Sequence, residues 1–475
     1  MTELGKQSRS ASRGALDRAN RKMISIWMGW GSRVLPFADV ATDDLPLSRL
    51  LRLSLIQVSV GVSLVLLAGT LNRVMIVELG VPATLVGVML ALPMLFAPFR
   101  ALIGFRSDAH VSALGWRRVP FILRGTMLQF GGLAMMPFAL LVLAGAGQSS
   151  SAPPWIGQAA AALAFLLVGA GVHITQTVGL ALATDQAPES AHPNIVGLMY
   201  SMLLIGMIVA ALLFGAALAD FSHGRLIQVI QGTAVVTFVL NFAALWKQEA
   251  RQPNRVIEAQ RTFQQSWALY AAEPHAIRRL VAVALGTLAF SMEDILLEPY
   301  GGQILGLSVG DTTKLTATFA GGGLLGFALA SRILSRGFDP FRMAIIGAAV
   351  GIPAFAMVIA AAPLHVAWLF VVGVGLIGFG GGLFGHGTLT ATMNFAPKEH
   401  IGLALGSWGA AQATAAGVGA ALGGFLRDVG QPAGLALPWP PAATGYIIVY
   451  AIEIVLLVAT LATMLPLRRA RPKSL

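Results

Sequence analysis

The 475-residue chain contains no cysteine, and charged residues make up only 11% of it. The absence of cysteine excludes disulfide bonds, thiolate nucleophiles and iron–sulfur or metal sites built on cysteine. The scarcity of charge excludes an ordinary soluble domain, in which about a quarter of the residues are charged. Apolar residues make up 56% of the chain, so the composition predicts a polytopic membrane protein.

The sequence also lacks the motifs of common enzyme classes: there is no HExxH, no nucleophile elbow and no phosphate-cradling GxxxxGK. We therefore expect no enzymatic activity. A cleavable signal is not expected either, because residues 1–22 are polar and basic and the first apolar piece, Met23–Trp30, is short. Its basic and aromatic neighbours favour a helix lying in the membrane interface, with a disordered tail as the alternative.

Twelve apolar runs are long enough to cross a bilayer as helices. They cover 53–77, 83–104, 118–145, 155–183, 196–219, 226–246, 279–300, 313–334, 341–362, 366–393, 400–425 and 443–466. The longest polar connection between them separates six runs from six. We predict an all-α fold of twelve transmembrane helices in two pseudo-symmetric halves, 53–246 and 279–466. A basic arm (1–52), a linker (247–278) and a basic tail (467–475) complete the predicted organisation.

The distribution of Lys and Arg predicts the orientation of the chain. With the N-terminus inside, 26 of the 32 Lys and Arg residues fall in inside segments and only three in outside loops. Both termini are therefore expected to be cytoplasmic. This asymmetry also accounts for the net charge of +11, so no nucleic-acid partner is expected.

The seventh run contains the segment LAFSMEDILLEPYGGQ (288–303), with three acids: Glu293, Asp294 and Glu298. Each ionised carboxylate near the centre of a bilayer costs roughly 2–3 kcal/mol, so such groups face a partner or a wet cavity. On a continuous helix Asp294 and Glu298 would share a face. Proline and glycine at 299, 301 and 302 are expected to loosen or end that helix.

The first run contains LAGTLNR (67–73), which aligns with LAFSMED (288–294) in the second half. This alignment places Arg73 opposite the acids of the seventh run. Our hypothesis is that Arg73 forms an ion pair with Asp294 or Glu293. The alternative is that Arg73 extends to the outer membrane surface. Arg124 in the third run also needs an acid or carbonyl partner.

The loop between the second and third runs contains Gly104, Asp108, Gly115, Arg117 and Arg118. This pattern resembles the signature loop of the major facilitator superfamily, although the spacing is stretched. The resemblance implies a charge relay in which the aspartate and the arginines clamp neighbouring helices on the cytoplasmic side.

Longer segments resemble the bacteriochlorophyll-delivery family within that superfamily, the light-harvesting-complex assembly proteins of purple phototrophs. They are PFADVATDDLPLSRLLRLSLIQVSVG (36–61), GTLNRVMIVELGVPA (69–83), FRALIGFRSD (99–108), ALGWRRVPFI (113–122), GTMLQFGGLAMMPFALL (125–141) and DILLEPYGGQ (294–303). The resemblance implies a multi-pass assembly factor of the intracytoplasmic photosynthetic membrane, the bacterial inner membrane. It would deliver bacteriochlorophyll a or chaperone antenna apoproteins, with the basic arm favouring the core antenna.

The resemblance also implies partners and cofactors. The expected partners are the light-harvesting α/β polypeptides and the reaction-centre core complex, together with bacteriochlorophyll synthase, the protein insertion machinery and membrane lipids. A carotenoid is a second expected pigment. Such a protein needs an axial ligand for magnesium, either an imidazole or a hard oxygen.

Two histidines lie well inside predicted helices, His173 and His386, and His386 is in a glycine-rich run. They are the first candidates for pigment ligands, and Glu293 and Glu298 are oxygen alternatives. The competing interpretation is structural: packing histidines, glycine seams between helices and carboxylates in ion pairs.

Two other functions stay open. A proton-coupled secondary transporter of a small solute would use the acids as proton relays and present several convergent polar groups near the membrane centre. A scaffold without a ligand would hold antenna helices against its lipid-facing surface.

Overall fold

The computed structural model describes residues 47–96, 115–145, 153–186, 192–249, 275–395, 401–430 and 439–467, with a few isolated residues between them. Every regular element in these ranges is a helix. The predicted interfacial helix at Met23–Trp30, most of the linker and Asp108 lie outside the described residues.

The predicted fold of twelve transmembrane helices is confirmed, because each predicted run corresponds to a helical segment. The first six segments are α2 (Leu47–Leu64) with η2 (Val65–Leu71) and η3 (Val74–Glu78), α3 (Ala83–Ala91) with η4 (Leu92–Phe96), α5 (Val119–Leu143), α6 (Pro154–Asp185), α7 (His192–Ala217) and α8 (His223–Leu245). The last six are α10 (Ala276–Ala289) with η7 (Glu293–Ile295) and α11 (Leu297–Gln303), α12 (Val309–Leu334), α13 (Pro340–Leu364), α14 (Ala367–Phe395), α15 (Ile401–Val429), and α16 (Thr444–Met464) preceded by η9 (Pro441–Ala443). Ten of these segments are long and apolar enough to cross a membrane, and α3 and α15 complete the set.

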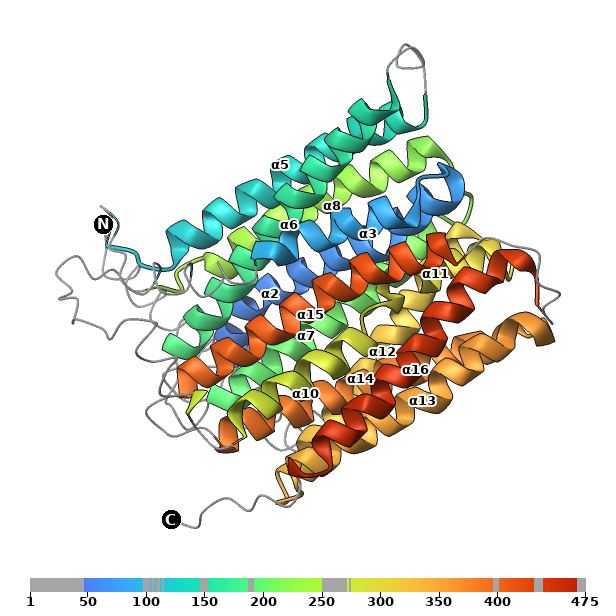
Figure 1. Cartoon of the computed structure of the whole chain (residues 1–475). Helices are drawn as coiled ribbons and strands as arrows, with labels where there is room; N and C mark the ends of the chain where they lie inside the picture. The colour runs from blue at the N-terminus through green and yellow to red at the C-terminus, as the bar shows by residue number, and fades with distance from the viewer. Residues whose placement is uncertain are drawn as a thin grey trace, which may run out of the picture.

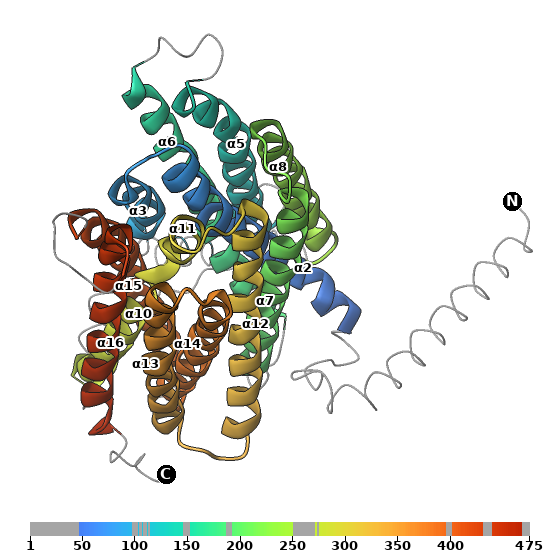
Figure 2. The same ribbon diagram turned by 90° about the vertical axis from the view of Figure 1, so that its right-hand side faces the viewer.

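The helices run roughly along one long axis (Figure 1), with the N-terminal and C-terminal groups on opposite sides of the bundle (Figure 2). Helix α5 packs on α6 and α8 in the first group, and α13 packs on α14 and α16 in the second. The two groups meet where α7 contacts α12 and where α3 contacts α15. Sites that use residues of both halves therefore lie along these two seams or between the helices that the seams enclose.

The first and seventh spans are irregular at positions that face each other. Residues 65–71 and 74–78 wind as π-helix, and the seventh span breaks between Ala289 and Leu297. The break has a local cause: Pro299 cannot donate a backbone hydrogen bond, and its ring clashes with the carbonyl four residues earlier. Because the helix restarts at Leu297, Pro299 falls in the first turn, where it is tolerated. The expected common face of Asp294 and Glu298 is therefore wrong.

Glycines of the tenth span, α14, form a close-packed seam with glycines of α12. A Cβ atom at Gly378 would overlap the carbonyl oxygen of Phe319, and one at Gly322 would overlap the carbonyl oxygen of Gly375. Only glycine lets the two backbones approach this closely. Gly385, on the same helix, faces open space.

We expect Gly378→Ala to lower the free energy of unfolding by about 1–3 kcal/mol, because the added methyl group has no room. The matched control is Gly385→Ala, which should leave stability unchanged or raise it slightly through the better helix propensity of alanine. Thermal unfolding in mild detergent compares the two. Equal losses in both variants would contradict the seam.

Candidate functional site

The acids of the seventh span do not form the expected ion pairs. Glu293 is fully buried and lies next to Glu453 of α16, which is also fully buried. No basic side chain among the described residues pairs with either carboxyl group. Two neighbouring carboxyl groups in an apolar interior can share one proton, so this pair is a candidate proton-binding site. Glu453 was not among the predicted site residues, because it is a single acid in an otherwise regular apolar run.

The two other acids have separate environments. Glu298 is buried and accepts a hydrogen bond from the Thr316 hydroxyl of α12. The Asp294 side chain is exposed, although its neighbour Glu293 is not. The backbone carbonyl of Asp294 accepts a hydrogen bond from the Asn72 amide at 3.3 Å, which joins the first and seventh spans. The predicted proximity of these two segments is therefore present, but an amide makes the contact.

Arg73 pairs with Glu78, so the hypothesis that it pairs with Asp294 or Glu293 is wrong. The π-helical winding of Val74–Glu78 explains the partner, because residues five apart come together in such a helix. The guanidinium group also donates to the Leu307 carbonyl at 3.3 Å. Arg73 is almost fully buried, so it does not extend to water as the alternative required.

Near Arg73, at the end of the bundle opposite the start of α2, a polar cluster joins four segments. Arg427 of α15 bonds the Gln303 amide oxygen of α11 at 2.7 Å and stacks on the Tyr446 ring of α16. Asp428 accepts hydrogen bonds from the backbone and hydroxyl of Thr84, at 2.7 and 2.6 Å, at the start of α3. This cluster was not predicted, because in the sequence Arg427 and Asp428 are only a charged pair at the end of an apolar run, as is common in exposed loops.

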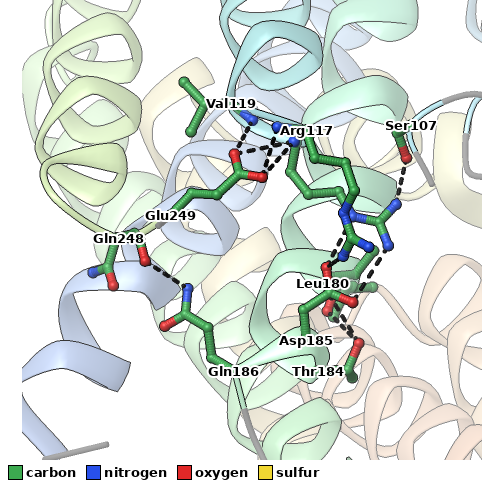
Figure 3. A network of polar contacts seen from close by, with 11 residues as sticks. Ser107, Arg117, Val119, Leu180, Thr184, Asp185, Gln186, Gln248 and Glu249 are labelled. Carbon is green, nitrogen blue, oxygen red and sulfur yellow. Dashed lines mark hydrogen bonds and ion pairs between the residues drawn. The ribbon is translucent and has the colours of Figure 1, made fainter. Parts of the chain in front are cut away.

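At the other end of the bundle, Arg117 and Arg118 form a charge network with Asp185 and Glu249 (Figure 3), whereas their predicted contact with Asp108, which lies outside the described residues, stays a prediction. Both arginines pair with Asp185 at the end of α6, Arg118 at 3.0 Å. Glu249 accepts hydrogen bonds from the backbone amides of residues 117–119 at 2.8–3.0 Å and so caps α5. Asp185 could have been singled out from the sequence, because it lies in the segment ATDQAP (183–188), which resembles TMNFAP (392–397) in the second half and marks the end of α6.

Arg124 forms neither an ion pair with an acid nor a hydrogen bond with a carbonyl among the described residues, so the expectation of such a partner is wrong. Its side chain is exposed on α5, and its guanidinium group lies 5.7 Å from the centre of the Phe121 ring. A cation over an aromatic face retains part of the stabilisation that an ion pair would give. One reason is that Arg124 lies only about one turn from the end of its helix, so the long side chain can reach the polar membrane surface.

His386 and His173 are both half-buried, on α14 and α6. The His386 ring lies 4.2 Å from the ring of Phe327 on α12, and Phe327 in turn lies 6.4 Å from Tyr200 on α7. His386 is therefore next to the seam between the two halves. Its Nδ1 atom is buried and has no hydrogen-bond partner.

The interior amides form hydrogen bonds with other interior side chains. Gln129 of α5 bonds the Ser63 hydroxyl, and the Asn241 amide of α8 donates to Thr126 at 3.1 Å. Their mutual hydrogen bonds tie α2, α5 and α8 together, which is how polar groups are commonly satisfied inside a helix bundle.

The fold defines a multi-pass membrane protein of the major facilitator type. A bacterial homologue of the human lysosomal transporter Spinster matches 89% of this chain and 96% of its own, with a TM-score of 0.63 and 13% identity. A bacterial homologue of the iron transporter ferroportin covers 89% of this chain and 98% of its own, with a TM-score of 0.62 and 15% identity. At such identities the likeness extends to the fold alone.

The chain belongs to the PUCC protein family, whose model matches residues 70–471. Protein PucC of Rhodovulum sulfidophilum is 63% identical over 87% of this chain and 92% of its own length. A Rhodobacter capsulatus protein from the puhA-bchM intergenic region is 50% identical over 96% of this chain and 95% of its own length. A third relative is described as the bacteriochlorophyll synthase 44.5 kDa chain of Rhodobacter capsulatus. It is 31% identical over 80% of this chain and 87% of its own length.

The partner of Arg73 can be tested by double-mutant cycles. We expect Arg73→Ala and Glu78→Ala to show a coupling energy of about 0.5–3 kcal/mol, since the two side chains form an ion pair in which Arg73 is buried. The parallel cycle of Arg73→Ala with Asp294→Ala should show almost none. Detergent unfolding of the six proteins measures both couplings, and a larger coupling to Asp294 would contradict the structure.

For the network at the α6 end, we expect Asp185→Asn to lower the free energy of unfolding by about 1–2 kcal/mol, because two arginines lose a charged acceptor. Asp311→Asn is the control, since Asp311 forms an exposed ion pair with Lys314 and such pairs contribute little. Thermal unfolding compares them. If Asp185→Asn lowered the free energy of unfolding no more than the control does, a stabilising role of the ion pairs between Asp185 and the two arginines would be refuted.

Proposed function

We propose that this protein is an assembly factor for light-harvesting antenna complexes in the intracytoplasmic photosynthetic membrane, with both termini cytoplasmic, and that it handles bacteriochlorophyll a. Membership of the PUCC protein family over most of the chain supports this. The relative described as a bacteriochlorophyll synthase chain supports a link to the pigment. The proposed partners are the light-harvesting α/β polypeptides, which need the pigment to assemble.

The observation that carries pigment handling is the environment of His386. A magnesium macrocycle requires an axial donor and flat apolar neighbours, and neutral imidazole is a suitable donor. His386 has a buried ring nitrogen without a hydrogen-bond partner, the Phe327 ring lies beside it, and the Tyr200 ring lies next to Phe327. These residues fit the group, so His386 would hold the magnesium. The bound pigment would supply the light-absorbing macrocycle of the antenna.

The other candidate ligands fit the pigment less well. Glu293 and Glu298 are enclosed by protein on all sides, so a macrocycle could not reach either carboxyl group without a rearrangement of the seventh span. His173 is half-buried on α6, the helix that corresponds to α14 in the first half, and is the second candidate ligand.

A proton-coupled transporter is the second candidate function, and the Glu293–Glu453 pair is the observation that favours it. Carboxyl groups inside transmembrane segments commonly serve as proton relays in transporters. This reading predicts no pigment and no antenna polypeptide on the purified protein.

The test is the absorption spectrum of the protein purified from its native membrane in mild detergent. We expect bound bacteriochlorophyll in the wild type and a loss of most of it in His386→Ala, because the axial ligand is gone. His223→Ala is the matched control, since His223 is an exposed histidine at the start of α8. His173→Ala tests the second candidate, and unfolding midpoints verify that each variant is folded.

Full pigment retention by His386→Ala would contradict the assignment of the ligand. A wild type without pigment that retains antenna polypeptides would favour apoprotein chaperoning. Mass spectrometry of those polypeptides would show whether core or peripheral antenna is served. A wild type with neither would support solute transport.

A further inference from the structure

A cavity of about 620 Å³ opens at the end of the bundle where α2 begins, and neither His386 nor the acid pair lines it. The start of α2, the start of α5 and the end of α8 form its walls. Most of the lining is apolar and includes the aromatic rings of Trp116, Phe242 and Trp246. A second cavity of about 450 Å³ lies beside it and shares Arg49 and Lys247. The first cavity alone is in the range of volumes that hold a drug-sized ligand.

The polar lining of these cavities is strongly cationic. Arg49, Arg52 and Lys247 line one or both of them. In the described part of the chain none of the three forms an ion pair. The Arg52 Nε atom is buried without a hydrogen-bond partner. Buried donors of this kind are normally satisfied, and an anionic ligand would supply an acceptor for this atom.

The one acid in the lining does not compensate these charges. Glu249 uses its two oxygens to accept hydrogen bonds from the backbone amides of residues 117–119, as Figure 3 shows for its carboxylate. Gln248 holds Arg49 in place by accepting from its Nε at 3.1 Å and from its Nη2 at 2.8 Å. The arginine is therefore fixed at the cavity, and its charge has no acid partner among the described residues.

The cavity continues onto the lipid-facing surface. Phe242 and Trp246 are 50% and 57% exposed. Phe242 stacks on Phe238 with ring centres 6.1 Å apart, and Phe238 meets Phe130 of α5 at 5.8 Å. These rings form an apolar strip that runs from the cavity toward the middle of the membrane. Tryptophans beside basic residues are typical of the level of lipid headgroups.

We infer that this cavity binds an anionic phospholipid. The phosphate sits against Arg52, Lys247 and Arg49, and an acyl chain follows the aromatic strip of Phe242, Phe238 and Phe130. The occupant has to be both anionic and amphipathic, because unpaired cations and an apolar groove open to lipid meet at one site. Basic pockets between transmembrane helices bind lipid headgroups in this way. The inference is independent of the proposed pigment function.

The experiment measures lipid binding to the detergent-solubilised full chain by native mass spectrometry. The probes are phosphatidylglycerol, phosphatidylcholine with the same acyl chains, and inorganic phosphate. We expect phosphatidylglycerol to bind tightest. In the double variant Arg52→Gln/Lys247→Gln its affinity should fall about 25-fold, the product of about fivefold for each charge removed.

The matched control is Arg225→Gln/Lys314→Gln, which removes two exposed cations at the opposite end of the bundle and should leave the affinity unchanged. Leu123→Trp fills the cavity without a change of charge and should also weaken binding. Equal affinity for the two lipids, or an equal loss in the control variant, would overturn the inference. Inorganic phosphate that displaces the lipid at similar concentrations would show that the acyl chain is not bound, which would also overturn it.

Discussion

Inside a lipid bilayer, backbone amides and carbonyls have no water to bond, so every irregular stretch of chain must be covered by protein. The first and seventh spans depart from regular α-helix where they face each other. Their irregular segments η2 and η7 are in contact, and α12 and α15 pack against them. Regular helices occupy the remaining positions, and glycine seams such as that between α12 and α14 bring them close enough to enclose the irregular pair.

The free-energy cost of burying polar groups away from water also explains where the charged groups lie. The arginines that are buried have partners near the ends of the bundle: Arg73 with Glu78, Arg118 with Asp185, and Arg427 with Asp428. Arg124, which has no acid partner, is exposed and lies over an aromatic ring. Glu293 and Glu453, in the middle of their spans, have no basic partner among the described residues and lie next to each other. Carboxyl groups can remain in such a place because a proton removes their charge, whereas an arginine cannot be neutralised.

The two ends of the bundle are built differently. At the start of α2, the network of Arg118, Asp185 and Glu249 connects segments of the first half only. At the opposite end, the contacts of Arg73 with Leu307 and of Thr84 with Asp428 cross between the halves. The halves are therefore tied by polar contacts beside the broken seventh span.

Hydropathy alone determined the twelve spans and the fold class, because each segment enters the membrane according to its own apolar content and needs no distant partner. The breaks were only partly foreseen: Pro299 marked the seventh span, but nothing marked the π-helix of the first. The partners of the charges could not be predicted. Asp185 is 67 residues from Arg118, and Asp428 is 344 residues from Thr84. Which of several carboxylates meets which base depends on helix rotation and winding, and only the packed tertiary structure decides that.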